Sequence, residues 1–221
     1  MNLFYLFLIS CLKAQDLVGY YSWNWGTGSI GPAIYPKVGI AFTGYVDVQT
    51  AIDGYNSLYC NYCPKLSGEN GPWITIGGGN DLGMYTKATL ENVIRDINLI
   101  KKANYSGVVF DIENVKGSSA EMIPLFRQAF ARAKEWGLTT VVTTSHSAPT
   151  VTDTPQDAVD FQLSWINDTN IDIISPQLYT FGNETEPDWS PTWQCTMPDG
   201  CEWWLYQNFK GIIAPSIVWH D

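Results

Sequence analysis

Basic residues are scarce in this chain of 221 residues, which has 12 Lys and Arg against 22 Asp and Glu and a formal net charge of −10. Nucleic acids are bound through a basic face, so this balance argues against a nucleic-acid partner. An acidic surface is typical of a soluble protein, and it is compatible with a neutral or cationic polymer as the ligand.

Long apolar segments are also missing. No stretch approaches the roughly 20 apolar residues that cross a bilayer, so we expect no membrane anchor. The short apolar run Leu3–Ile9, followed by small residues, predicts a secretory signal peptide over residues 1–14 with cleavage near Ala14. Residues 15–221 would then form a single secreted, extracellular domain. A buried first strand is the alternative interpretation of the run.

Cysteine is infrequent, and its placement favours disulfides over metal binding. Removal of the signal peptide removes Cys11 and leaves Cys60, Cys63, Cys195 and Cys201. An even number in a secreted chain indicates two disulfides, with three possible connectivities. Proximity in sequence favours pairing within 60–63 and within 195–201. A four-cysteine zinc site is the alternative, but the spacing of the second pair is wide for such a site. We expect no metal and no organic cofactor.

Aromatic residues, by contrast, are plentiful, with 10 Trp and 12 Tyr. Many of them can belong to a core, but Trp and Tyr rings also stack on the apolar faces of sugars. The excess is therefore a weak indication of a carbohydrate ligand. Three glycosylation sequons begin at Asn104, Asn167 and Asn183, and they are compatible with a glycosylated exterior.

Short apolar runs alternate with helical patterns along the chain. The runs are rich in Val, Ile and aromatic residues, and several lack alternation, as is typical of strands buried on both faces. We predict seven strands, at Leu17–Ser22, Val38–Thr43, Trp73–Gly77, Gly107–Ile112, Thr139–Thr144, Ile171–Gln177 and Ile212–Val218.

Three helices are predicted between these runs. The first begins near Thr86, the second at Ser118 or Ser119 with a stop at Gly137, and the third runs from Thr154 to Trp165. Strands that alternate with helices predict a parallel sheet, although periodicity does not distinguish an open sheet from a closed barrel. A (β/α)8 barrel has about 250 residues and at least about 200, so this chain lies at the lower limit.

Two carboxylates end the fourth predicted strand. In the run Gly107-Val-Val-Phe-Asp111-Ile-Glu113 the acids are two residues apart, so they point to the same face of a strand. They lie at its C-terminal end, where parallel α/β sheets and barrels place their active sites. Acids that are merely solvated, or that cap the next helix, are the alternative.

The pattern Gly107-x-x-x-Asp111-x-Glu113 resembles the second half of the signature Asp-Gly-x-Asp-x-Asp-x-Glu of glycoside hydrolase family 18, the chitinases. Ser106 and Val109 stand where that family has Asp. Three further segments resemble the family's motifs on the third, sixth and first strands, in the same order: Ile74-Thr75-Ile76-Gly77-Gly78-Gly79, Gln177-Leu178-Tyr179, and Leu17–Tyr21 followed by Trp23.

The resemblance implies a (β/α)8 TIM barrel and hydrolysis of chitin or a related N-acetylglucosamine polymer by a monomer. The nucleophile would be the substrate's own N-acetyl group. Glu113 would be the general acid, Asp111 would orient the acetamido group, and Tyr179 would donate its hydroxyl to the acetamido carbonyl. The resemblance also assigns Gln177 and Gly78 to the sugar site.

Further aromatic and polar residues are candidates for sugar binding. Trp23 and Trp25 follow the first strand and could stack on sugar rings, with packing over the barrel mouth as the alternative. His146 ends the fifth strand and could line the cleft, or it could be a loop histidine with a backbone partner. The tryptophan-rich stretch Trp189–Trp204 could form a cleft wall or a small core under a long loop.

Two departures separate this chain from the family pattern. Val109 removes the acid beneath Asp111, so we expect Asp111 to be held ionised by other partners such as Ser145 or the tyrosines. The last run, Ile212–Val218, is interpreted as the seventh strand, which predicts a small barrel without its eighth strand. The alternative takes Trp219 as the family's eighth-strand tryptophan. A non-catalytic chitin-binding lectin and an unrelated secreted α/β protein remain as alternative functions.

Overall fold

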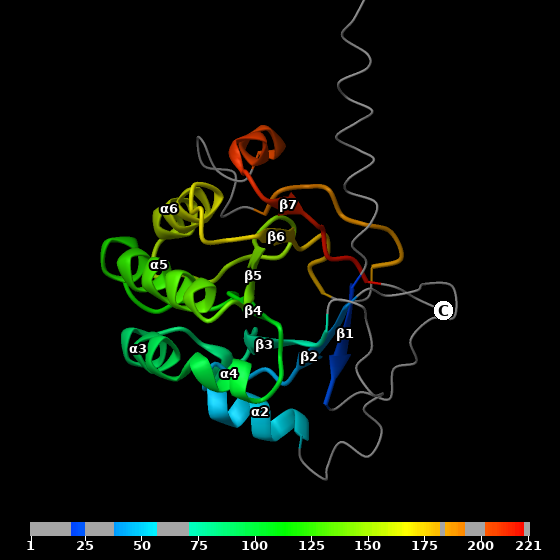
Figure 1. Ribbon diagram of the computed structural model, residues 1–221. Helices are drawn as coiled ribbons and strands as arrows, with labels where there is room; N and C mark the ends of the chain where they lie inside the picture. The colour runs from blue at the N-terminus through cyan, green and yellow to red at the C-terminus, as the bar shows by residue number, and fades with distance from the viewer. Residues whose placement is uncertain (1–18, 25–37, 57–70, 182–183, 193–201, 219–221) are drawn as a thin grey trace, which may run out of the picture.

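Seven parallel strands form one sheet in the order β1 to β7, and the sheet curls into a half-barrel like part of a TIM barrel (Figure 1). The computed structural model describes residues 19–24, 38–56, 71–181, 184–192 and 202–218. No eighth strand occurs in these residues. The strands are β1 Gly19–Trp23, β2 Val38–Phe42, β3 Trp73–Gly77, β4 Gly107–Asp111, β5 Thr139–Thr144, β6 Ile173–Pro176 and β7 Ile212–Ile213.

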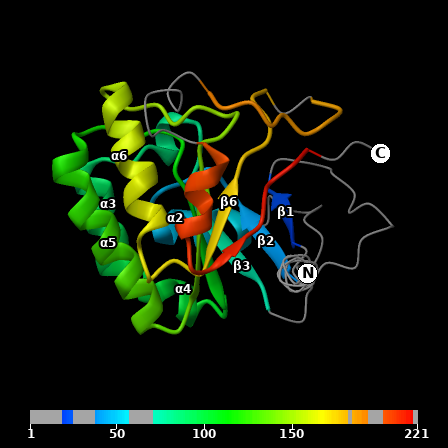
Figure 2. The same cartoon turned by 90° about the horizontal axis from the view of Figure 1, so that it is seen from above.

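Helices connect the strands and cover one side of the sheet (Figure 2). The three helical regions expected from the sequence are found, the first of them divided between α3 and α4. The helix α2 and the short 3-10 helices η1 and η2 were not expected. The elements are α2 Val48–Asn56, η1 Asp81–Gly83, α3 Lys87–Asp96, α4 Asn98–Lys102, α5 Ser119–Glu135, α6 Pro155–Ile166 and η2 Trp203–Asn208.

Local signals explain where the helices begin and end. The Thr86 side chain accepts a hydrogen bond from the Thr89 backbone N–H, and the Thr89 side chain accepts one from the Thr86 backbone N–H, which forms a capping box at the start of α3. Thr154 caps α6, which has a proline at its first position. Gly137 follows α5 with a φ of 66°, a left-handed conformation that a glycine adopts without strain.

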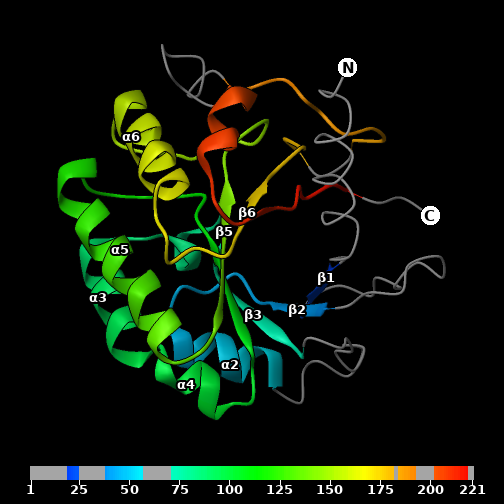
Figure 3. The ribbon, with the colours of Figure 1, turned by 45° about the horizontal axis from the view of Figure 1, so that its top comes forward.

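The two faces of the sheet are packed differently (Figure 3). On the outer face, Val108 and Phe110 of β4 are fully buried in a large core against the helices. The inner face carries a small apolar cluster of Val38, Ile40, Trp73, Val109, Val141 and Ile173. Because side chains alternate along a strand, this packing fixes which residues of each strand point inward.

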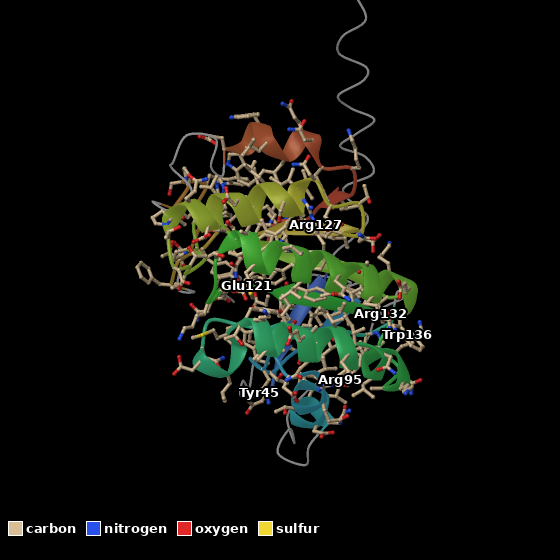
Figure 4. The ribbon with its side chains drawn as sticks, turned by 90° about the vertical axis from the view of Figure 1, so that its left-hand side faces the viewer. Tyr45, Arg95, Glu121, Arg127, Arg132 and Trp136 are labelled. Carbon is tan, nitrogen blue, oxygen red and sulfur yellow. The ribbon has the colours of Figure 1, made fainter. Side chains whose placement is uncertain are left out.

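The outer surface of the helices is charged (Figure 4). Arg95 pairs with Asp96, and Arg132 pairs with Glu135. Exposed pairs of this kind contribute about 0–1 kcal/mol each, so they keep the surface soluble rather than hold the fold. Within the described residues, no helix is long and apolar enough to cross a membrane.

The curl brings the segment after β7 back toward β1 (Figures 1 and 2). Tyr21, on the inner face of β1, lies near Ser216 and Ser175, whose hydroxyls act to lower its pKa. The two serine hydroxyl oxygens lie 2.6 Å apart. One tyrosine therefore bridges the interior between the two edges of the sheet.

Several sequence predictions concern segments outside the described residues. These are the signal peptide over residues 1–14, the two disulfides, the sequon at Asn183, and the aromatic residues Trp25 and Trp219. The division into a signal peptide and a domain over 15–221 stays a prediction.

Candidate active site

The fourth strand delivers both predicted carboxyl groups to the inner face. Val109 belongs to the inner cluster, and Asp111 and Glu113 follow it at spacings of two, so they point the same way. Asp111 is only 4% exposed. Glu113 is half-buried, and its carboxylate lies against Gly79 after β3, where an added Cβ would collide with Oε2. The acids are therefore enclosed side chains rather than solvated ones.

Asp111 is held from the neighbouring strand. The Thr143 hydroxyl of β5 donates to Asp111 Oδ1 over 2.8 Å. Burial raises the pKa of Asp111 well above its ordinary value, and the charge of Glu113 raises it further. The Thr143 hydrogen bond acts in the opposite direction, whereas a hydrogen bond with Glu113 adds to the rise. Burial is the largest of these effects, so the environment shifts Asp111 toward its neutral form.

Gln177 connects Glu113 with Tyr179. Its side-chain Nε2 lies 3.0 Å from the Tyr179 hydroxyl and 3.5 Å from Glu113 Oε1. An amide nitrogen has two hydrogens, so it can donate to both groups at once. Tyr179 then accepts from Gln177 and keeps its own hydrogen for another acceptor. The structure thus brings together the predicted residues Asp111, Glu113, Gln177 and Tyr179.

Three tyrosines surround the acids with hydroxyl groups that stay protonated. Burial raises the pKa of Tyr21, Tyr85 and Tyr179, and in each case the nearby charge of Asp111 contributes to the rise. Tyr85 donates to the Ile76 carbonyl over 2.7 Å. The hydrogen of Tyr85 is thus used within the protein, whereas Tyr179, whose oxygen accepts from Gln177, is a neutral donor beside the pair of acids.

An aromatic group stands beside the site on β1 and β2. Trp23 is 53% exposed, and its ring centroid lies 6.3 Å from that of Phe42. A Cβ at Gly78, whose φ is 138°, would lie 3.4 Å from the Phe42 ring, so Gly78 lies next to this aromatic pair. An exposed indole ring supported by a second aromatic ring is suited to stacking on a sugar.

His146 lies in a different environment from the acids. It is fully buried, with Nε2 2.7 Å from the Trp189 carbonyl oxygen and its ring centroid 4.0 Å from that of Trp203. Trp203 also packs against Trp189 and Tyr206. These contacts favour the loop histidine with a backbone partner, and they show the described part of Trp189–Trp204 as a small aromatic cluster.

The surroundings of Asp111 differ in part from those expected. Ser145 donates to the Ala148 carbonyl and accepts from the Thr150 backbone N–H. Asp111 is also driven toward the neutral form rather than held ionised, because burial outweighs the hydrogen bond from Thr143. Sequence reasoning missed Thr143, although its position two residues after the inward Val141 marks it as inward.

A buried hydroxyl on β3 lies opposite Val109, the position where the family pattern has an acid. Val109 stands opposite Thr75 in the β3–β4 register. The Thr75 hydroxyl is fully buried and has no hydrogen-bond partner. Buried hydroxyls are normally satisfied, so this one marks a polar position whose neighbour is apolar.

The arrangement is suited to acid–base chemistry. Among the described residues, no group of three His, Cys, Asp or Glu side chains could hold a metal ion. Two acids at one strand end, one of them driven toward its neutral form, can hold and release a proton. The tyrosine and amide donors can bind a neutral polar ligand beside them.

Known proteins give limited guidance. No protein-family model and no curated protein sequence matches the chain. Among solved structures it is similar to the group IV chitinase of Ostrinia furnacalis, with a TM-score of 0.42 and 15% identity over 74% of this chain and 51% of that chain. The same enzyme in complex with allosamidin gives a TM-score of 0.42 and 16% identity over the same shares. The chain thus spans about half the length of that enzyme, and any activity assigned to it rests on its own side chains.

Proposed function

We propose that the chain is a secreted glycoside hydrolase that cleaves β-1,4-linked N-acetylglucosamine polymers such as chitin. The observation that supports this most is the convergence of Asp111, Glu113 and Tyr179, with the Gln177 amide 3.0 Å from the tyrosine hydroxyl and 3.5 Å from Glu113. One aminosugar could contact all three side chains from one side. The motif resemblance and the exposed Trp23 are compatible with this substrate.

The reaction is substrate-assisted and retaining. The acid pair holds one shared proton, which Glu113 delivers to the glycosidic oxygen as the bond to the anomeric carbon breaks. The acetamido oxygen of the substrate bonds to that carbon and forms an oxazolinium ion. Asp111, left as a carboxylate, accepts from the acetamido N–H and stabilises the positive charge.

Tyr179 and water complete the cycle. Tyr179 donates its hydroxyl hydrogen toward the acetamido oxygen and orients it for attack, because its own oxygen is occupied by Gln177. Water then attacks the anomeric carbon on the face opposite the acetamido oxygen, and the bond between that oxygen and the anomeric carbon breaks, which restores the N-acetyl group. Glu113 takes the proton of that water, and the acid pair regains the proton with which it began.

Glu113→Gln tests the proposal. The general acid typically contributes about 10²- to 10⁴-fold to the rate, so release of a fluorophore from a chito-oligosaccharide glycoside should fall by that factor. Affinity for the oligosaccharide should persist, because the amide keeps the size of the acid. Glu121→Gln is the matched control: it changes an exposed glutamate of α5, paired with Lys87 at 3.2 Å, and should leave turnover unchanged.

The unmutated chain separates the alternatives. Binding of chito-oligosaccharides without turnover would favour a lectin on the same scaffold. Absence of any affinity for chitin would contradict both and leave an unrelated α/β protein. Parallel assays against chitin, bacterial cell wall and N-glycan cores identify the polymer.

A further inference from the structure

Asp111 has one polar neighbour among the strand positions that flank it. Val109 lies beneath it on β4, and Gly77 stands opposite it on β3. On β5 the register pairs Phe110 with Val142, which places Thr143 beside Asp111. Since valine and glycine offer no side-chain hydrogen bond, a donor from a neighbouring strand position comes from β5.

The hydrogen bonds of Thr143 have a fixed direction. Its Oγ1 accepts from the Ile112 backbone N–H over 3.1 Å, and Oγ1 lies 2.8 Å from Asp111 Oδ1. A hydroxyl has a single hydrogen, and a backbone N–H can only donate. Two acceptors lie near Oγ1, and Asp111 Oδ1 at 2.8 Å is closer than the Phe110 carbonyl oxygen at 3.4 Å, so the Thr143 hydrogen is directed to Oδ1. In a neutral Asp111 the acid proton belongs on the other oxygen, Oδ2.

We propose that Thr143 is a positioning residue that orients the Asp111 carboxyl group and fixes its proton on Oδ2, within reach of Glu113. This inference rests on the proposed function, because its value lies in directing the shared proton toward the general acid. Thr143 contacts the Asp111 carboxyl group from the neighbouring strand β5. An acid at position 109 would contact it from the preceding inward position of β4. Thr143 is only 2% exposed, so it acts through Asp111.

A hydroxyl on the opposite flank does not serve this purpose. Thr75 of β3 is fully buried beside Val109, yet its Oγ1 has no hydrogen-bond partner. Asp111 therefore receives its threonine hydrogen bond from β5 and not from β3.

Four ionisable groups from the surrounding elements face Asp111: Glu113 after β4, Tyr21 of β1, Tyr85 before α3 and Tyr179 after β6. The tyrosines stay neutral, so Glu113 is the other carboxyl group of the four that faces Asp111. Thr143 does not titrate. Its removal therefore changes the proton affinity of Asp111 in one direction, upward, because its hydrogen bond favours the ionised form.

The test uses Thr143→Val, which keeps the shape and removes the hydroxyl, and Thr143→Ser, which keeps the hydroxyl. Thr140→Val is the matched control, because Thr140 lies on the same strand, is equally buried, and has a hydroxyl without a partner. In Thr143→Val we expect kcat to fall by about 10- to 100-fold, the loss of one hydrogen bond to a charged group, with KM changed less than about threefold. Thr143→Ser should restore kcat.

A second measurement does not depend on activity. The melting temperature of each variant is measured from pH 4 to 9, with Asp111→Asn as the reference that cannot ionise. Loss of the Thr143 hydrogen bond should make the fall in melting temperature continue to higher pH. Thr140→Val should give a constant offset, and Thr143→Val in the Asp111→Asn background should do the same.

Two sets of results would overturn the role of Thr143. In the first, Thr143→Val keeps both the wild-type kcat and the wild-type pH profile. In the second, Thr143→Ser is as impaired as Thr143→Val, or Thr140→Val has the same pH dependence. If the unmutated chain hydrolyses no oligosaccharide, the proposed function fails, and the melting profiles alone decide whether Thr143 controls Asp111.

Discussion

The two faces of β4 show how one strand serves stability and chemistry at once. Its outward residues Val108 and Phe110, with the following Ile112, are buried among apolar side chains of the helices. Its inward residues change from apolar to acidic along the strand, from Val109 to Asp111 and Glu113. A one-residue change in register would exchange the two sets, so the same period of two that builds the core also aims the acids.

The difference lies in what burial does to each face. On the outer face, burial of an apolar side chain stabilises the fold by about 1.5–3 kcal/mol for a full residue. On the inner face, burial raises the pKa of Asp111 and therefore costs stability wherever the acid would otherwise be ionised. Burial on the outer face therefore stabilises the fold. Burial on the inner face offsets part of that stabilisation, because it disfavours the ionised form of Asp111.

The largest expected effect is on the outer face, in Phe110→Ala. Phe110 is fully buried, with its ring 4.9 Å from that of Phe130 in an edge-to-face contact. Truncation should lower the free energy of unfolding by about 3–5 kcal/mol, measured by denaturant titration. At a temperature where the variant remains folded, kcat should stay within about threefold of wild type. A large loss of kcat with unchanged stability would contradict the division between the faces.

The next effect is on the inner face, in Gly79→Ala. A Cβ at this position would collide with Glu113 Oε2, so the general acid must move. A displacement of about 1 Å can cost about 100-fold in rate, and we expect a fall of this size in kcat on a chito-oligosaccharide glycoside. Gly54→Ala in α2 is the control, because its Cβ would meet the Tyr45 ring at 3.3 Å and no carboxylate. Equal losses of kcat in both variants would show that the position of Glu113 is not what Gly79 protects.

Much of the fold, and the placement of the two acids on the same face of the sheet, could be predicted from the sequence. The bounds of β3 and β5 match the predicted runs, and β1, β2, β4 and β6 differ by one or two residues at their ends, whereas β7 is Ile212–Ile213 and ends well before the predicted Val218. Spacing alone placed Asp111 and Glu113 on one face, because alternation along a strand is a local property. The helix starts at Thr86 and Thr154 followed from local capping signals for the same reason.

What could not be predicted depends on the register between strands. Thr143 meets Asp111 only because β4 and β5 pair with Phe110 opposite Val142. The cluster of His146 with Trp189 and Trp203 joins segments more than 40 residues apart. The helix α2 contains the glycine Gly54 and has no basic residue in its last turn, so its local signals are weak and its packing against the sheet decides its form.

The smallest expected effect is the change of melting temperature in Asp111→Asn. Its pH dependence has a sign that distinguishes the inner face from the outer face. In the folded chain the pKa of Asp111 lies above its unfolded value of about 3.9, because of burial first and Glu113 second. The folded state therefore holds a proton that the unfolded chain releases. The stability associated with this group is complete below about pH 4 and is lost as the pH rises through the folded pKa.

Asparagine cannot ionise, so the variant should melt at a higher temperature than wild type at neutral pH, with the gap closing toward about pH 4. Each kcal/mol regained should raise the melting temperature by about 2–4 °C in a domain of this size. Asp188→Asn should behave oppositely, because hydrogen bonds from Ser190 lower the pKa of Asp188 and its contribution is lost as the pH falls. The melting temperatures of Asp111→Asn and wild type could instead differ by a constant amount from pH 4 to 9. In that case burial does not raise the pKa of Asp111. The shared proton would then need a source other than the burial of Asp111.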